Sequence, residues 1–218
     1  MSNSVDEKTS AEKADIELDT SGSHGSMHNK MKQLLASFSA LDYISPLEIP
    51  NIDLYIEQVT SFLDNELASA RRTPDDKTLT KTMINNYAKN GLLPPQEKKK
   101  YNKEHVLTLI FIYYFKNMMS ISDIHALLSP ITEEYFGNKD GFNMEDVYKE
   151  VFSLEAVETE KMVKDLAKKY KRANETFKDF PEKDQKYLHT FSLIAMLAYD
   201  VYIKKMLIQH MIDENQDE

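Results

Sequence analysis

Polar side chains that could recognise DNA bases gather on one face of a short segment, residues 80–91. Thr82, Asn85, Asn86 and Lys89 follow at spacings that bring them onto the same side of a helix. An asparagine amide can pair bidentately with adenine, and threonine offers a hydroxyl and a methyl group that can touch thymine. Lysine neutralises phosphates and fixes the register of a protein on the duplex. The segment therefore predicts a surface that binds double-stranded DNA.

Basic residues lie on both sides of this polar face. Lys81 opens the segment, and the run Lys98–Lys100 follows the break at Pro94-Pro95. Residues 71–104 hold nine Lys or Arg and four Asp or Glu, a local charge of +5 in a chain of net charge −9. A local basic region can still bind an anion, because salt screens exposed charges beyond about 8 Å. We expect the lysine run to contact phosphate; a solvated turn is the alternative interpretation.

Hydrophobic periodicity predicts the helices that must hold this face in place. Apolar residues recur mostly at helical spacing and strand-like alternation is almost absent, so we expect an all-α fold. The helix over residues 103–119 is apolar almost all round, which predicts that it is buried at the centre of the fold. The predicted helices cover residues 31–41, 51–70, 80–91, 103–119, 121–128, 143–172 and 181–211.

Capping residues, glycine and proline set the limits of these helices. Asn51, Thr80 and Asn143 are predicted N-caps, because their side chains can accept a hydrogen bond from a backbone amide of the first turn. Gly91 is expected to end the helix that carries the polar face. Pro130 is expected to close the helix after the central apolar one.

The last predicted helix carries two apolar rows instead of one. A helix in a monomer of this size seldom needs two apolar faces, so the C-terminal half is expected to hold a subunit interface or a ligand pocket. One row is Tyr187, Phe191, Ile194, Ala198, Val201 and Ile208, and the other is Leu188, Ala195, Tyr199, Tyr202 and Met206.

The spacing around the polar face resembles a known family pattern. From Thr82 the chain runs T-M-I-N-N-Y-x-x-x-G-L-L, which is similar to the recognition helix of the MerR family, roughly R-T-L-R-Y-Y-x-x-x-G-L. The second tyrosine of that pattern falls on Tyr87, and its Gly-Leu falls on Gly91. Residues 101–109 and 120–128 are similar to the segment that follows the wing and to the start of the next helix. The resemblance implies a helix-turn-helix region.

A closer resemblance spans most of residues 48–170. The segments DLYIEQV, TKTMINNY, KNGLLPP and KKKYNKEH are similar to a bacterial family known as domain of unknown function 1836, whose members are regarded as MerR-like helix-turn-helix regulators. Relative to MerR proteins, the wing is reduced to residues 95–100 and the recognition-helix arginines are absent. The candidate DNA-binding residues are Thr80, Lys81, Thr82, Asn85, Asn86, Tyr87, Lys89, Lys98, Lys99, Lys100 and Tyr101. Tyr87 and Tyr101 are interpreted as packing residues whose hydroxyls touch phosphate.

Several other classes of function lack their residues in this chain. There is no cysteine, which excludes a disulfide framework, a cysteine zinc site and a thiol nucleophile, and which fits a reducing cytosol. No glycine-rich phosphate loop or Gly-x-Ser-x-Gly elbow is present, and the six histidines are scattered, so neither an enzyme nor a metal or cofactor site is expected. The N-terminus has no apolar signal region, and the run over residues 106–115 is too short to span a bilayer.

These inferences combine into one hypothesis and one alternative. We expect an acidic disordered tail over residues 1–28, a helix-turn-helix DNA-binding domain over 29–130, and a helical dimerisation or effector region over 131–218. The hypothesis is a cytoplasmic transcriptional repressor that binds a palindromic site as a homodimer, with a small-molecule or protein effector on its C-terminal region. The alternative is a helical interaction or ligand-sensing module without DNA binding, favoured by the acidic remainder of the chain and the missing arginines.

Overall fold

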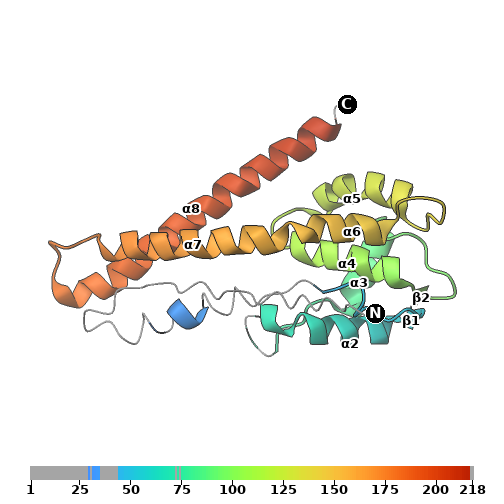
Figure 1. Ribbon diagram of the computed structural model, residues 1–218, viewed down its shortest axis with the longest axis horizontal. Helices are drawn as coiled ribbons and strands as arrows, with labels where there is room; N and C mark the ends of the chain where they lie inside the picture. Colours follow the sequence, from blue (N-terminus) through green and yellow to red (C-terminus); the bar gives the residue numbers. More distant parts are fainter. Residues whose placement is uncertain (1–28, 30, 35–43, 72, 74, 217–218) are drawn as a thin grey trace, which may run out of the picture.

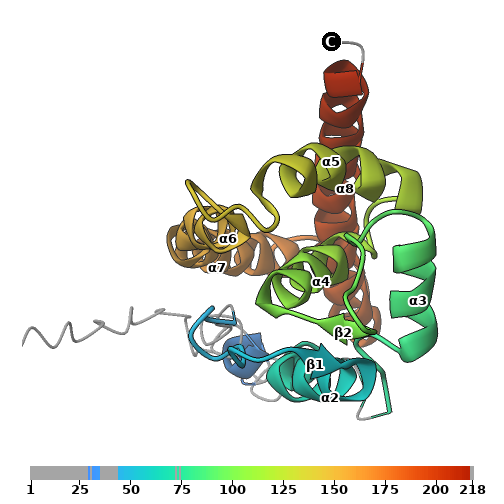
Figure 2. The same ribbon diagram turned by 90° about the vertical axis from the view of Figure 1, so that its right-hand side faces the viewer.

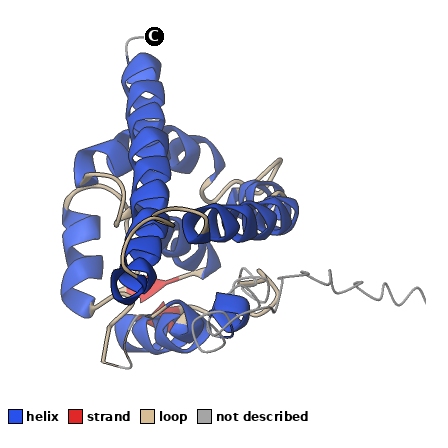
Figure 3. Ribbon diagram, turned by 90° about the vertical axis from the view of Figure 1, so that its left-hand side faces the viewer, coloured by secondary structure: helices blue, strands red, loops and turns tan. Residues whose placement is uncertain are grey.

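The computed structural model describes residues 29, 31–34, 44–71, 73 and 75–216. The predicted tail, residues 1–28, lies outside the described residues, as does the greater part of the predicted helix 31–41, of which residues 31–34 are helical. The elements are β1 (Leu54–Tyr55), α2 (Ile56–Glu66), the 3₁₀ helix η1 (Ala68–Ala70), α3 (Lys81–Lys89), β2 (Lys100–Tyr101), α4 (Lys103–Phe115), α5 (Ile121–Tyr135), α6 (Met144–Ser153), α7 (Glu155–Asn174) and α8 (Glu182–Gln216). The protein is thus mostly helical, as predicted (Figures 1 and 3).

Helix α4 lies at the centre of the main core. Its residues from His105 to Ile112 are all buried, which matches an apolar character on every side. The helix begins at an N-cap, Asn102, whose side chain accepts a hydrogen bond from the amide of His105 at 3.0 Å. Helices α2, α3, α5 and α6 surround it (Figure 2). The core therefore fixes the elements around α4 relative to one another.

A two-stranded sheet replaces the predicted first turn of α2. Leu54 pairs with Tyr101 and Tyr55 pairs with Lys100, antiparallel. The helix starts only at Ile56, where the Gln58 side chain accepts a hydrogen bond from the Tyr55 amide at 2.8 Å. The predicted start after Asn51 is wrong for this reason, and Ile52 and Tyr55, which lie before the helix, are 65% and 53% exposed. Strands of two residues show no alternation that a sequence pattern could reveal.

Helix α5 passes through the proline that was expected to end it. Pro130 lies inside the helix, which continues to Tyr135. A proline in a helix lacks the amide for one backbone hydrogen bond. Ile131 and Tyr135 pack against the main core beyond it, and the Thr132 hydroxyl donates to the Leu128 carbonyl at 3.0 Å. These contacts offset the proline and extend α5 by seven residues over the predicted end at residue 128.

The predicted helix over residues 143–172 is two helices. They meet at Leu154, which ends α6 and begins α7 and whose side chain is 62% exposed. Val151, three residues earlier, is exposed as well. Helix α6 packs on α4, whereas α7 leaves the core and packs on α8, so one straight helix could not serve both contacts. The α6 residues in the main core are Met144, Tyr148 and Phe152.

Helices α7 and α8 form a long hairpin that extends from the main core (Figure 1). Tyr170, Ala173 and Leu193 form a second, small core between them. The far part of α8 returns to α5, and Ile212 is buried there. Most other large apolar residues of α8 are exposed: Tyr187, Phe191, Ile194, Tyr199, Val201, Tyr202, Ile203, Met206, Leu207 and Met211. Within the described residues, no helix has both the length and the apolar character that crossing a bilayer requires.

Candidate nucleic-acid interface

Helix α3 presents the predicted polar face to solvent. Its inner side buries Ile84 and Tyr87 in the main core. The opposite side leaves four side chains exposed, namely Thr82, Asn85, Asn86 and Lys89. The Thr80 hydroxyl accepts a hydrogen bond from the Met83 amide at 3.2 Å, so this predicted contact residue serves as the N-cap. The outward direction of the four candidate side chains is as expected from the helical spacing.

The C-terminal end of α3 is a Schellman motif. The Leu92 amide donates to the Tyr87 carbonyl at 2.9 Å, and the Gly91 amide donates to the Ala88 carbonyl at 3.2 Å. Gly91 has φ of +74°, a left-handed conformation that glycine adopts without a steric cost. Leu92 is buried beside Tyr87, which is the apolar contact that accompanies this motif. The predicted end of the helix at Gly91 is confirmed.

A cluster of charged groups anchors the chain just before α3. The Asp64 carboxylate accepts hydrogen bonds from the Thr78 amide at 3.1 Å and from the Thr78 hydroxyl at 2.5 Å. Arg71 and Lys77 approach the same carboxylate at 3.3 and 3.8 Å. Lys116, at the end of α4, donates to the Thr78 carbonyl, and burial lowers the pKa of its ammonium group. The long connection between α2 and α3 is thus tied to both α2 and α4.

The predicted wing is a tight hairpin turn over residues 97–100. The Lys100 amide donates to the Glu97 carbonyl at 2.9 Å. Lys98 and Lys99, the two central residues, have φ of +51° and +61°. Positive φ at both central positions defines the twisted hairpin turns that asparagine and glycine normally occupy. Both lysines are exposed, while Lys100 places its ammonium group 5.3 Å from the centre of the Tyr55 ring.

The two predicted tyrosine contacts are core residues. Tyr87 is 5% exposed and Tyr101 is 2% exposed. The Tyr101 hydroxyl accepts a hydrogen bond from the Gln96 side chain at 2.8 Å. Burial raises the pKa of both hydroxyls. The sequence interpretation of these tyrosines as packing residues agrees with their positions, and little of either side chain is left to touch a phosphate.

An ion pair that spacing alone does not predict covers the start of α3. Lys81 Nζ lies 2.5 Å from the carboxylate of Glu57, on the first turn of α2. The hydrogen bond from Lys81 lowers the pKa of that carboxyl. The two residues are 24 apart in sequence, and only the packing of α2 on α3 brings them together. The positive charge at this end of α3 is therefore partly compensated within the protein.

His105 connects α4 to the segment that leads into the turn over residues 97–100. Its Nδ1 lies 3.2 Å from the Asn102 amide nitrogen and 2.7 Å from the Asn102 side-chain oxygen, and its Nε2 lies 3.2 Å from the Pro94 carbonyl oxygen. Burial lowers the pKa of the imidazole. Spacing along the sequence did not single out His105; its place three residues after the N-cap Asn102 is the signal that could have done so.

Most of the candidate residues are attached to one core. The exposed side chains of α3 and the two turn lysines belong to elements anchored on it, through Thr78 on one side and Pro94 on the other. Among the described residues, no group of three His, Asp or Glu side chains is placed to hold a metal ion. The chemistry that this surface offers is hydrogen bonding by amides and a hydroxyl together with neutralisation of anions by ammonium groups.

Comparison with known proteins places the candidate residues within a segment that matches one protein family. Residues 44–151 match the model of a family described as Domain of unknown function (DUF1836). The match runs almost to the limits of the main core, whose buried residues extend from Ile44 to Phe152. No curated protein and no solved structure matches the chain.

Proposed function

We propose that this chain, which belongs to the DUF1836 family through residues 44–151, is a transcriptional repressor that binds a palindromic DNA site as a homodimer. In this proposal α3 enters the major groove and the turn over residues 97–100 contacts the phosphate backbone. One observation carries it: a short helix with an exposed row of Thr82, Asn85, Asn86 and Lys89 and a turn that exposes two lysines are anchored on the same core.

The dimensions of α3 suit the major groove. An α-helix with its side chains is about 10–12 Å across, and the groove is about 12 Å wide. Asn85 and Asn86 are exposed on successive positions, so either amide can reach a base edge. The helix is capped at both ends and anchored through Ile84 and Tyr87, which means that little order has to be gained when it binds.

The turn lysines supply the contact that is independent of sequence. Lys98 and Lys99 are exposed and follow one another, and each phosphate contact that they make would release about one counterion. Because Lys81 is paired with Glu57, we expect it to contribute less to phosphate contact than Lys98 and Lys99 do. Binding is therefore expected to depend on salt less steeply than the number of lysines in the segment suggests.

Helix α8 supports the dimer. Its exposed apolar residues recur along a helix of 35 residues, roughly 52 Å long. A solvent-facing apolar surface of this extent is typical of a surface covered by another protein. Pairing of α8 with α8 of a second copy would relate two α3 helices by a two-fold axis, and half-sites would lie about 34 Å apart on the DNA.

A titration with the DNA upstream of the protein's own reading frame tests the proposal. Fluorescence anisotropy should show binding at low salt with affinity that falls as salt rises. Asn85→Ala should cost about 1–3 kcal/mol at particular base pairs, and Asn117→Ala, an exposed asparagine after α4, serves as its control. Absence of any binding at low salt would overturn the proposal.

A matched pair of lysine variants tests the turn. The double change Lys98→Ala and Lys99→Ala should weaken binding to every sequence and reduce the salt slope by about 1 per phosphate contact. The control is Lys168→Ala with Lys171→Ala, two exposed lysines of α7. Equal losses in the two double variants would mean that binding reflects overall charge and not the turn.

The second candidate function is that of a helical protein-interaction module. The exposed apolar residues of α8 and the Glu57–Lys81 pair, which lowers the charge of the α3 surface, favour it. Under this alternative, charge reversal at Lys89 leaves function intact. A pull-down with the protein recovers a partner protein that binds α8, and the complex survives nuclease treatment. Loss of partner recovery in Tyr202→Glu, with full recovery in Lys89→Glu, would support the interaction module over DNA binding.

A further inference from the structure

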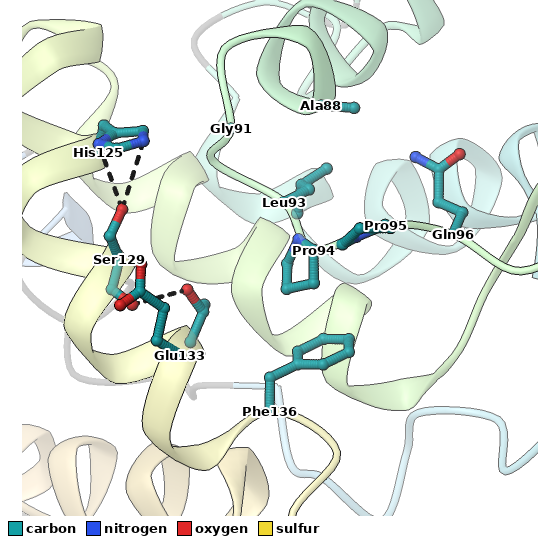
Figure 4. A pocket seen from close by; sticks show the side chains of 11 residues that line it. Ala88, Gly91, Leu93, Pro94, Pro95, Gln96, His125, Ser129, Glu133 and Phe136 are labelled. Atoms are coloured by element: carbon teal, nitrogen blue, oxygen red, sulfur yellow. Dashed lines mark hydrogen bonds between the residues drawn. The ribbon is translucent and has the colours of Figure 1, made fainter.

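A pocket of about 690 Å³ lies between the C-terminal end of α3, the segment over residues 93–96 and the outer face of α5 (Figure 4). This volume falls within the range of pockets that hold small molecules, roughly 300–1,000 Å³. Gly91, Pro94 and Gln96 line it from the α3 and wing side, while His125, Glu133 and Phe136 line it from the side of α5.

The α5 wall is polar. His125, Ser129 and Glu133 follow at four-residue steps and share one face of the helix (Figure 4). The Ser129 hydroxyl lies 3.2 Å from Nδ1 of His125. Glu133 is exposed to the pocket side, and within the described residues no basic side chain forms an ion pair with it. The wall therefore offers one carboxylate that is available to a ligand.

The apolar part of the lining is fixed in place. Pro94 and Phe136 both contact the buried His105: Nε2 of the imidazole lies 3.2 Å from the Pro94 carbonyl, and the ring meets that of Phe136 edge to face at 4.7 Å between centroids. Leu93 and Pro95 complete this surface. Because His105 contacts both residues, this apolar surface is in place before any ligand arrives.

The charge of the lining selects the sign of the ligand. It contains Glu133 and no lysine or arginine. We infer that the pocket binds a small organic amine, with the ammonium group on the Glu133 carboxylate and a flat apolar body against Pro94 and Phe136. A carboxylate ligand of the same shape would meet a like charge and is excluded on that ground.

Occupancy of this pocket would act on the surface described above, a step that rests on the proposed function. Gly91 belongs to the terminal motif of α3, and Pro94 and Gln96 lead into the turn that carries Lys98. A ligand that touches all three contacts both elements that carry the proposed DNA-binding residues, and its positive charge lies beside them. The amine is then expected to change the affinity for DNA.

The binding test uses the full chain without DNA and three probes of one shape, namely 2-phenylethylamine, 2-phenylethanol and phenylacetate. Amide and side-chain NMR signals of His125 and Phe136 should shift saturably with the amine, more weakly with the alcohol and not with the carboxylate. Glu133→Gln should weaken binding of the amine by about threefold or more, as expected for a solvent-facing ion pair. Glu134→Gln, the adjacent exposed carboxylate outside the pocket, should leave it unchanged.

The outcomes separate this site from the proposed function. Equal binding of amine and carboxylate, equal effects of the two glutamine variants, or no saturable shift with the amine would overturn the pocket assignment. Amine binding that meets these criteria, in a protein that binds no DNA, would retain the site and reject the proposed function. DNA binding that the amine leaves unchanged in the parent chain would reject the coupling between them.

Discussion

Gly91 lies so close to His125 that a Cβ atom on residue 91 would stand 3.0 Å from the imidazole Nε2. The end of α3 therefore approaches α5 at a position where an added Cβ would require the His125 side chain to shift, and where φ of +74° also favours glycine. Two costs are combined at one residue: backbone strain of about 1–2 kcal/mol for a side chain in the left-handed region, and the displacement of a histidine.

Gly91→Ala should therefore lower the free energy of unfolding by more than the strain alone. Gly137→Ala is the matched control, because Gly137 has φ of +73° but no atom within 4 Å of an added Cβ. We expect a loss of about 1 kcal/mol for Gly137→Ala and clearly more for Gly91→Ala in urea denaturation. Addition of His125→Ala to Gly91→Ala should recover part of the difference in stability between the two glycine variants. Equal losses at the two glycines would show that the contact with His125 carries no cost.

Asp64→Ala should release the connection that precedes α3. Burial raises the pKa of the Asp64 carboxyl, but the hydrogen bonds from Thr78 and the charges of Arg71 and Lys77 together lower it by more. The pKa of this carboxyl therefore lies below its usual value. Removal of the carboxylate leaves two Thr78 donors without their acceptor, at a cost of about 1–3 kcal/mol. Asp75→Ala, an exposed residue of the same connection, is the control. Urea denaturation would reveal the difference, and equal stability of the two variants would contradict the anchoring role.

Replacement of the two turn lysines should separate stability from DNA binding. Lys98→Asn combined with Lys99→Gly places residues that tolerate positive φ in the turn and should raise stability by about 0.5–2 kcal/mol. Affinity for DNA should fall at the same time, because two exposed cations are lost. The alanine pair at these positions should lose affinity without the gain in melting temperature. A variant that gains stability and keeps full affinity would mean that the lysines are not the phosphate contact.

Stability should fall in mildly acidic solution because of His105. Burial lowers the pKa of its imidazole below the ordinary value of 6.5, against smaller opposing contributions from the Pro94 carbonyl and Asp53. At a pH between the pKa of His105 in the folded chain and its pKa in the unfolded chain, the unfolded chain binds more protons. The contribution of His105 to the free energy of unfolding is therefore complete above the pKa in the unfolded chain, and it is lost as the pH falls through the pKa in the folded chain. The slope from one histidine is at most about 1.4 kcal/mol per pH unit.

Chemical denaturation across about pH 5 to 8 measures this slope. His105→Gln should flatten the profile, whereas His210→Gln, at an exposed position on α8, should keep the shape seen in the parent chain. An unchanged profile in His105→Gln would assign the pH dependence to other groups.

Local signals in the sequence were sufficient for α3 and its polar face. Thr80 and Gly91 mark both ends through hydrogen bonds within a few residues, and the spacing of Asn85 and Lys89 fixes which side faces outward. Those bonds depend on short stretches of chain, which is why a pattern can reveal them.

Features that depend on distant residues were not predictable in this way. The pairing of Leu54 with Tyr101 joins residues far apart in the chain and moves the start of α2. The continuation of α5 through Pro130 depends on Ile131 and Tyr135 reaching the core, which outweighs a local rule. The Glu57–Lys81 pair likewise follows from the packing of two helices. In each case tertiary contacts decide against the local preference.

The buried position of Phe152 has a practical consequence for dividing the chain. Its ring stacks on Phe111 at 5.4 Å and lies 4.3 Å from Tyr148, so α6 completes the hydrophobic surface of α4. A fragment cut at residue 130 would leave that surface open to water and prone to self-association, whereas a cut just after Leu154 would keep it covered. The segment proposed to bind DNA and the α7–α8 hairpin are consequently not interchangeable modules joined by a linker, because one residue separates the last helix of the first from the first helix of the second.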